Sequence, residues 1–220
     1  MRVMSKVRGN NSDVVYQSML EDMRHGVILP GDKLAAETLG RNYQVSRTVI
    51  REVLARLEQN NIVERTVNAG CRMRIFSLRE LCDMFEIREA VEKLAVEKLT
   101  ACGATPEEIA SLRKYSDQWI LAKDPIEREG ADRNFHQLIC SSCGSSVLQK
   151  VAVDNYIIFN VFNNARHFLD SCHPKRSRSE ASRDEHHAIV EAIAAGDVKL
   201  AGKRLAAHIA SARKRFERMI

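Results

Sequence analysis

The stretch that decides the fold of the first third of the chain reads Gln44-Val-Ser-Arg-Thr-Val-Ile-Arg-Glu-Val-Leu54. Ser46 is a good N-cap for a helix that we expect to run through Gln59. One face of this helix is apolar, with Val49, Ile50, Val53, Leu54 and Leu57. The other face begins with the polar and basic side chains Arg47, Thr48 and Arg51. Such a helix is typical of one that packs on a core and presents its N-terminal end to nucleic acid.

The segments on either side complete a small module. Apolar residues at helical spacing precede the stretch, with Ser12 as a plausible first N-cap. A turn signal, Asn68-Ala69-Gly70, separates two short extended segments after it. The expected elements are helices over residues 13–25, 34–43 and 46–59 and strands over residues 62–67 and 71–75. Three helices followed by a two-stranded hairpin predict a winged helix-turn-helix domain over residues 12–76.

Several side chains of this module have the chemistry of DNA contacts. Arginine bridges guanine O6 and N7 or binds phosphate, and Ser and Thr at a helix N-terminus hold phosphate. Gly70 allows the hairpin tip to approach a sugar-phosphate backbone, and Arg65 and Arg72 flank that tip. The candidate DNA-binding residues are Ser46, Arg47, Thr48, Arg51, Arg65, Gly70 and Arg72. The alternative is a surface helix whose arginines pair with Glu52 or Glu58.

Charge is unevenly distributed along the 220 residues. Residues 1–76 contain 12 Lys and Arg against 8 Asp and Glu, whereas the remainder accounts for only +1 of the total net charge of +5. An excess of positive charge in one module agrees with a polyanionic partner, although a solvated basic surface gives the same arithmetic.

Composition excludes several classes of protein. Hydrophobic residues make up 45% and charged residues 29%, with only 5% aromatics and four prolines, which favours a mostly helical globular chain over an all-β one. No apolar run is long enough for a transmembrane helix, and the basic N-terminus lacks the apolar stretch of a signal peptide. We therefore expect a cytoplasmic protein with no membrane partner, whose six cysteines are free thiols.

After residue 76 the sequence predicts only helices. Thr105-Pro106-Glu107-Glu108 is a clear helix start with a capping box, and Ser182 with Glu185 predicts a second one. The expected helices cover residues 78–99, 105–122, 124–140, 146–168, 182–195 and 197–220, with a basic loop over residues 171–179. This pattern predicts an all-α bundle over residues 77–220, so that the whole chain is mainly α.

Four polar side chains lie on the otherwise apolar faces of these helices. Asp132 and His136 are four residues apart, and His186 and His208 lie among apolar residues at helical spacing. One carboxylate and three imidazoles form a plausible site for Zn²⁺, Ni²⁺ or Mn²⁺. The alternative is that each histidine is an ordinary core residue. The pair Cys140 and Cys143 has the spacing of a metal or redox motif, but flanking a helix end is the favoured interpretation.

Residues 14–75 resemble the DNA-binding domain of the GntR family of bacterial transcription regulators. The matching stretches are Gly26…Pro30-Gly31-Asp32-Lys33-Leu34, then Val45-Ser46-Arg47-Thr48…Arg51-Glu52…Leu54…Leu57, and the hairpin ending at Gly70. The resemblance implies that Ser46, Arg47, Thr48, Arg51 and Gly70 contact DNA. The chain departs from many members at Val49, where they have Pro, and at Asn61, where they have Gly. It also has Glu37 and Thr38 where members often place an Arg.

Residues 79–216 resemble the helical effector domain of the FadR branch of that family, the FCD domain. The matching pieces are Glu86-Ile-Arg88-Glu-Ala-Val-Glu92, Asp132-x-x-x-His136, Glu185-His186-x-Ala-Ile-x-Glu-Ala-Ile193, Gly196-Asp197 and His208. The resemblance implies that Asp132, His136, His186 and His208 bind a divalent metal and that Arg88 lies beside the carboxylate of an effector. An internal ion pair between Arg88 and Glu92 is the alternative.

Together these resemblances imply a homodimeric transcription regulator, expected to be a repressor, whose binding to double-stranded operator DNA responds to a small organic acid. It is expected to be associated with the bacterial nucleoid when bound to DNA, and not to be an enzyme. One rival is a metal-dependent hydrolase or lyase that uses the same Asp and three His, with Glu92 as general base. Another is a DNA-architectural protein whose buried histidines are simply core.

Overall fold

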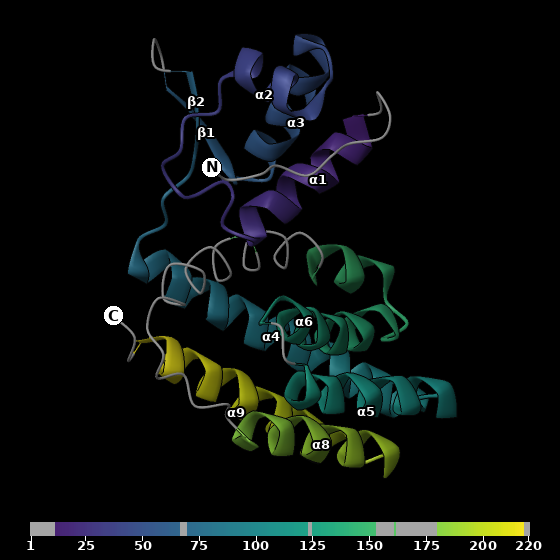
Figure 1. Ribbon diagram of the computed structural model, residues 1–220. Coiled ribbons are helices and arrows are strands. Elements are labelled where there is room, and N and C mark those ends of the chain that lie inside the picture. The colour runs from purple at the N-terminus through teal and green to yellow at the C-terminus, as the bar shows by residue number, and fades with distance from the viewer. Residues whose placement is uncertain (1–11, 67–69, 123–124, 153–160, 162–179, 218–220) are drawn as a thin grey trace. The chain divides into compact units, whose positions relative to one another are not determined.

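A computed structural model describes residues 12–66, 70–122, 125–152, 161 and 180–217 of the chain (Figure 1). The chain divides into two compact units, with a boundary between Ser77 and Leu78. The described part is mainly helical with one two-stranded sheet, which confirms the predicted fold class. No helix among these residues is both long and apolar enough to cross a bilayer.

The first unit begins with three helices, which Figure 1 draws in purple and blue: α1 (Ser12–Arg24), α2 (Ala36–Tyr43) and α3 (Arg47–Gln59). The turn between α2 and α3 is tight. Gln44 has a left-handed backbone, with φ of 59°, and a Cβ on Gly40 would lie 3.0 Å from the Val45 carbonyl oxygen. Any side chain at this position would push the Val45 carbonyl by a few tenths of an ångström, so glycine relieves a tight contact in the turn.

Helix α3 begins and ends as predicted. The Ser46 side chain accepts a hydrogen bond from the backbone N–H of Val49, at 3.3 Å, and so caps the helix. After Asn60, the C-cap residue, Asn61 adopts the left-handed conformation with φ of 55°. The apolar face is buried through Ile50, Val53, Leu54 and Leu57.

The predicted hairpin is present. Strand β1 (Val63–Thr66) pairs antiparallel with β2 (Gly70–Met73), and Thr66 lies opposite Gly70. Gly70 has φ of 81°, and open space surrounds the position where a Cβ would project. An isolated bridge between Lys33 and Arg72 extends the sheet toward the start of α2, which begins at Ala36, two residues later than predicted.

A buried polar contact links α1 to α2. The Tyr43 hydroxyl donates to the Asp22 carboxylate, at 2.6 Å, and both residues are buried. Burial, together with this hydrogen bond to the carboxylate, raises the pKa of Tyr43, so the phenol stays protonated as a donor.

The second unit is an all-α bundle, which confirms that prediction for the described residues (Figure 1). Its helices are α4 (Leu78–Cys102), α5 (Pro106–Leu121), α6 (Pro125–Ser141), α8 (Glu180–Ala194) and α9 (Val198–Glu217). Helix α9 packs between α4 and α8, and α5 packs against α6 and α8. Helices α6, α8 and α9 thus face one interior, and the four candidate metal ligands lie on these three helices.

Capping boxes were predicted at Thr105 and at Ser182, and only the first prediction is confirmed. Thr105 and Glu108 form the predicted capping box at the start of α5. The second capping box was predicted wrongly, because α8 already begins at Glu180, before Ser182. Glu185 instead hydrogen-bonds to His208 on α9, so tertiary packing overrides the local pattern.

Part of the predicted helix over residues 146–168 is observed. Residues 146–152 are helical, as is Val161, whereas the rest of that segment, the predicted loop over residues 171–179 and Cys172 lie outside the described residues. The five described cysteines are free thiols, as predicted.

Candidate nucleic-acid interface and metal centre

The candidate DNA-binding side chains of the first unit come from α3 and the hairpin. Arg47, Thr48 and Arg51 are exposed near the N-terminal end of α3, and the Ser46 hydroxyl caps that end. Arg47 pairs with Glu37 of α2, with 3.3 Å between Nη2 and Oε1. The pairing partners expected under the surface-helix interpretation were Glu52 and Glu58. Glu52 accepts instead from Ser12, at 2.7 Å.

Both hairpin arginines contact residues outside the hairpin. Arg65 pairs with Glu58 of α3, at 3.3 Å, and Arg72 donates to the Gly31 carbonyl oxygen, at 3.2 Å. A cavity of about 340 Å³ lies between the start of α2, α3 and the hairpin, and its cationic lining residues are Lys33, Arg51 and Arg65. Basic side chains therefore gather where α3 meets the hairpin, a suitable place for a DNA phosphate.

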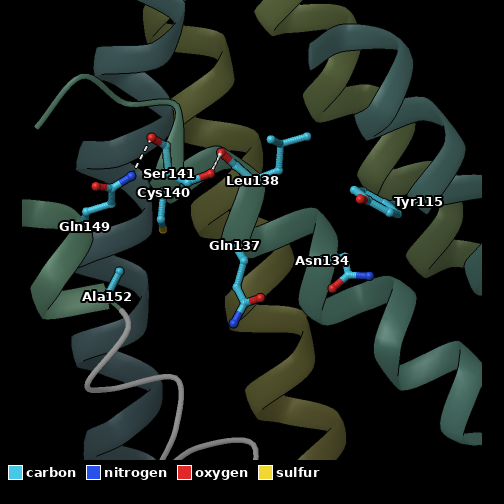
Figure 2. A pocket seen from close by; sticks show the side chains of 8 residues that line it. All are labelled: Tyr115, Asn134, Gln137, Leu138, Cys140, Ser141, Gln149 and Ala152. Atoms are coloured by element: carbon cyan, nitrogen blue, oxygen red, sulfur yellow. Dashed lines mark hydrogen bonds between the residues drawn. The ribbon is translucent and has the colours of Figure 1, made fainter. Parts of the chain in front are cut away.

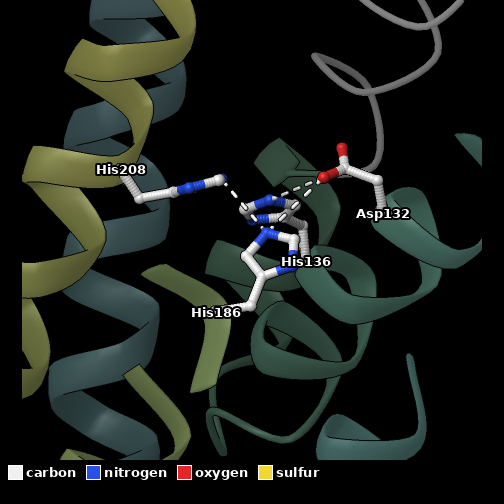
Figure 3. A group of neighbouring side chains, drawn as sticks. All are labelled: Asp132, His136, His186 and His208. Atoms are coloured by element: carbon white, nitrogen blue, oxygen red, sulfur yellow. Dashed lines mark hydrogen bonds and ion pairs between the residues drawn. The ribbon is translucent and has the colours of Figure 1, made fainter. Parts of the chain in front are cut away.

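The second unit brings the four predicted metal ligands together. Figure 3 shows Asp132 and His136 from α6, His186 from α8 and His208 from α9 pointing toward one another. One ligand atom from each of the four lies within 4.8 Å of all the others. The three histidines are buried, and the Asp132 side chain is 30% exposed.

The spacing suits a metal ion. Nε2 of His186 lies 3.2 Å from Nε2 of His208, and Asp132 Oδ1 lies 3.5 Å from Nε2 of His186 and 3.8 Å from Nε2 of His136. An ion that binds N and O ligands at about 2.0–2.2 Å holds neighbouring ligand atoms roughly 3.0–3.6 Å apart, which the distances from His186 to His208 and to Asp132 match. The donor set, three imidazoles and a carboxylate, suits a borderline transition metal rather than Ca²⁺ or Mg²⁺.

Two carboxylates orient the ligands from behind. Nδ1 of His136 donates to Glu92 Oε2, at 2.6 Å, and Nδ1 of His208 donates to Glu185 Oε2, at 2.8 Å. With the proton on Nδ1, the Nε2 lone pair of each ring faces the common centre. Burial lowers the pKa of His208, against the opposing effect of Glu185, and so favours the neutral imidazole that a metal requires.

Sequence reasoning did not identify Glu92 and Glu185 as partners of the ligands. Glu92 was considered as a general base or as a partner of Arg88, and Glu185 as a capping residue. The sequence does place both glutamates near other candidate site residues, because Glu92 follows Arg88 by one helical turn and Glu185 directly precedes His186. Their contacts with His136 and His208 join different helices, however, and spacing within one segment does not reveal them.

Arg88 lies beside this cluster. It is buried on α4, and its Nε donates to Glu92 Oε1, while the other oxygen of Glu92 accepts from His136. The ion pair given as the alternative for Arg88 is therefore present. One carboxylate thus connects the guanidinium to a candidate metal ligand.

A separate cavity of about 460 Å³ adjoins α6 (Figure 2). Its lining residues on α6 include Asn134 and Leu138, on the face opposite Asp132 and His136, and Cys140, on the same face as His136. Gln149 closes one side by donating to the Ser141 carbonyl oxygen, at 2.7 Å. None of the four candidate metal ligands is among the residues that line this cavity, although at Cys140 it reaches the face of α6 that carries His136.

Cys140 and Cys143 are buried close to these features. Burial raises the pKa of the Cys140 thiol, and the Glu92 carboxylate adds to the effect. A thiol held protonated is a poor metal ligand and a poor nucleophile, which supports a packing role at the end of α6.

Two protein families match the parts of the chain that contain these two candidate sites. The FCD domain family matches residues 83–211, and the family of bacterial regulatory proteins, gntR family, matches residues 11–73. The chain belongs to the GntR family and carries an FCD domain. It is a DNA-binding transcription regulator, in which the winged helix-turn-helix precedes the FCD effector domain.

Curated relatives of this GntR regulator are also named HTH-type transcriptional regulators. The uncharacterized HTH-type transcriptional regulator BphR of Paraburkholderia xenovorans (strain LB400) is 26% identical over 207 residues, which cover 90% of the chain and 82% of BphR. The HTH-type transcriptional regulator LutR of Bacillus subtilis (strain 168) is 25% identical, over 85% of the chain and 92% of LutR.

Solved structures show the same fold. The E. coli protein McbR/YncC superposes with a TM-score of 0.80 at 19% identity, covering 94% of the chain and 97% of McbR/YncC. A GntR-type protein described as a putative transcriptional regulator from Rhodococcus sp. RHA1 has a TM-score of 0.72 at 21% identity, covering 93% and 96%.

Proposed function

We propose that this GntR regulator is a metal-containing repressor of the FadR branch, which releases or binds its operator in response to a small carboxylate. The observation that carries the proposal is the cluster of Asp132, His136, His186 and His208, whose ligand atoms lie within 4.8 Å of one another. Carboxylates behind two of the rings support the same conclusion.

The DNA-binding domain in this proposal covers residues 12–76, and residues 77–220 bind the effector and form the homodimer. Two recognition helices of a dimer fit successive major-groove faces of a near-palindromic operator. The proposed DNA contacts are Ser46, Arg47, Thr48, Arg51, Arg65, Gly70 and Arg72. Their exposure on α3 and around the hairpin supports this assignment.

The proposed metal is Zn²⁺, Ni²⁺ or Mn²⁺, held by Asp132, His136, His186 and His208. When bound, the ion supplies a Lewis-acidic position at which an effector carboxylate replaces water. Arg88 offers a second anion contact, because its guanidinium is buried beside the cluster and a planar fork of N–H donors matches a carboxylate. Coupling to DNA requires that the effector bind one dimer geometry more tightly than the other.

A metal-dependent hydrolase or lyase is the weaker interpretation. Its general base was expected to be Glu92, which is buried and hydrogen-bonded to both Arg88 and His136. A carboxylate in that position orients a ligand rather than activating a metal-bound water.

The proposal is tested by metal analysis and DNA binding on the same preparations. We expect about one divalent ion per chain in the wild type and none after His136→Ala. We also expect Arg47→Ala and Arg51→Ala to abolish operator binding while retaining the ion. Wild-type protein without metal, whose thermal stability is unchanged by chelator, would instead support core histidines. Unchanged operator binding by both arginine variants would disprove the DNA assignment.

A further inference from the structure

Glu37 brings a carboxylate to the N-terminal end of α3. It is the second residue of α2, and its Oε1 lies 3.3 Å from Nη2 of Arg47, the first residue of α3. Both side chains are largely exposed, 60% for Glu37 and 65% for Arg47. Since DNA is a polyanion, a carboxylate at a DNA-reading surface weakens general affinity and needs a compensating role.

A contribution of the Glu37–Arg47 ion pair to the stability of the fold does not explain why a carboxylate is present there. Water screens the charges of an exposed ion pair, so such pairs contribute little to the free energy of unfolding. Comparable pairs in the described part of this unit lie elsewhere on α3. Asp13 pairs with Arg56 near its C-terminal end, and Glu58 pairs with Arg65 of the hairpin. Glu37 differs in contacting a side chain at the end of α3 that a recognition helix presents to base edges.

We propose that Glu37 is a specificity-determining residue, which positions the Arg47 guanidinium for guanine and itself accepts a hydrogen bond from the N4 amino group of cytosine. Arginine donates to guanine O6 and N7 in the major groove, and a carboxylate accepts from cytosine N4. The paired side chains thus match a G·C base pair. This inference rests on the proposed DNA contacts of α3.

The same pair keeps Arg47 away from phosphates. A guanidinium that is neutralised by Glu37 has less attraction for phosphate oxygens, and the carboxylate repels them. Phosphate contacts carry no direct sequence information, whereas base contacts do. Glu37 therefore lowers the affinity for DNA of any sequence and increases the discrimination between bases.

The test compares full-length wild type with Glu37→Gln and Glu37→Ala. Preferred duplexes are selected from a random pool with the wild type, and affinities are measured for that duplex, each single-base variant and random DNA over a range of salt concentrations. We expect the wild type to prefer G·C at one position by at least about fivefold. Both variants should lose that preference, bind random DNA more tightly, and show a log–log salt slope steeper by about one.

Asp13→Asn is the matched control, because it removes one charge from an exposed pair with Arg56 at the other end of α3. It should leave the base preference unchanged. If both Glu37 variants change affinity equally for all sequences, the inference is wrong even though DNA binding by α3 stands. Arg47→Ala separates the two claims: preferred-site binding that survives it removes the DNA-contact assignment on which Glu37 depends.

Discussion

At the scale of single residues, two carboxylates lie behind the histidines of the proposed metal site. Glu92 and Glu185 each accept from Nδ1 of a ring whose Nε2 faces the centre. Such a contact fixes the tautomer and orientation of the imidazole and raises its basicity. We therefore expect the two glutamates to raise the metal affinity of the proposed site without belonging to its ligand set.

Replacing Glu185 by Gln should weaken metal binding by about 10–100-fold, because the amide orients His208 less firmly and does not raise its basicity. Glu185 is partly exposed, so the substitution is expected to leave the fold intact. Competition titration with a chromophoric chelator measures the change. Glu191→Gln is the control, since Glu191 is also on α8 but pairs with Arg113 at the surface. Equal affinity of wild type and Glu185→Gln would contradict the assigned role.

Tyr43→Phe should destabilise the first unit by about 1–3 kcal/mol, because the buried Asp22 carboxylate loses its phenol donor. Urea denaturation followed by circular dichroism measures the loss. Tyr115→Phe, at a partly buried position in the second unit, should change stability much less. A Tyr43→Phe protein as stable as the wild type would show that the hydrogen bond contributes no net stability.

The clustering of the four candidate ligands could be predicted from the sequence, but their carboxylate partners could not. Asp132 and His136 are one helical turn apart, so spacing alone placed them on one face. The contact of His136 with Glu92, and that of Arg47 with Glu37, join different helices. Those contacts depend on how helices pack, which periodicity within one segment does not encode.

At the scale of elements, the two predicted capping boxes show when a local sequence pattern is sufficient to predict where a helix begins. The capping box of α5 formed as predicted, because Thr105 and Glu108 need only each other's backbone. The similar pattern at Ser182 does not start a helix, because α8 already begins at Glu180, and Glu185 contacts His208 on α9. Strand pairing and the α3 cap were likewise local and were predicted correctly.

Thr105→Ala should cost about 1 kcal/mol, because the first turn of α5 loses its side-chain acceptor. Thermal or urea unfolding of the purified chain measures this cost. Thr105→Ser is the control, since serine keeps the hydroxyl and should retain most of the stability. Equal losses in both variants would show that the hydrogen bond is not the source of the effect.

Glu108→Gln should reduce stability at neutral pH but not in acid. Hydrogen bonds from Ser142 and from the Thr105 backbone lower the pKa of Glu108 in the folded chain. Its contribution is therefore complete above the pKa of an unfolded glutamate, about 4.3, and is lost as pH falls through the lower folded value. Urea unfolding at several pH values should show the two proteins converging in acid. A difference that is as large in acid as at neutral pH would contradict this.

At the scale of the whole molecule, the proposed ion connects three helices of the FCD domain. Ligands from α6, α8 and α9 converge on it, so metal binding should stabilise their packing. Saturation at 100 times the dissociation constant is worth about 2.7 kcal/mol. Chelation should therefore lower the unfolding temperature and reloading should restore it.

His186→Gln should remove this metal-dependent stabilisation, and His187→Gln should retain it, because His187 is partly exposed and contacts Asp117 instead. Differential scanning calorimetry with and without chelator measures both. Equal chelator sensitivity of the two variants would show that the ion binds elsewhere.

The most direct test of the account is a thermal-shift screen of small carboxylates against chelated and metal-reloaded protein. The account predicts at least one carboxylate that raises the unfolding temperature only when metal is present, and whose effect is reduced by Arg88→Gln. It also predicts that this compound changes operator affinity. Carboxylates that stabilise the chelated protein equally well, or a metal-loaded protein that responds to none of a broad set, would contradict it.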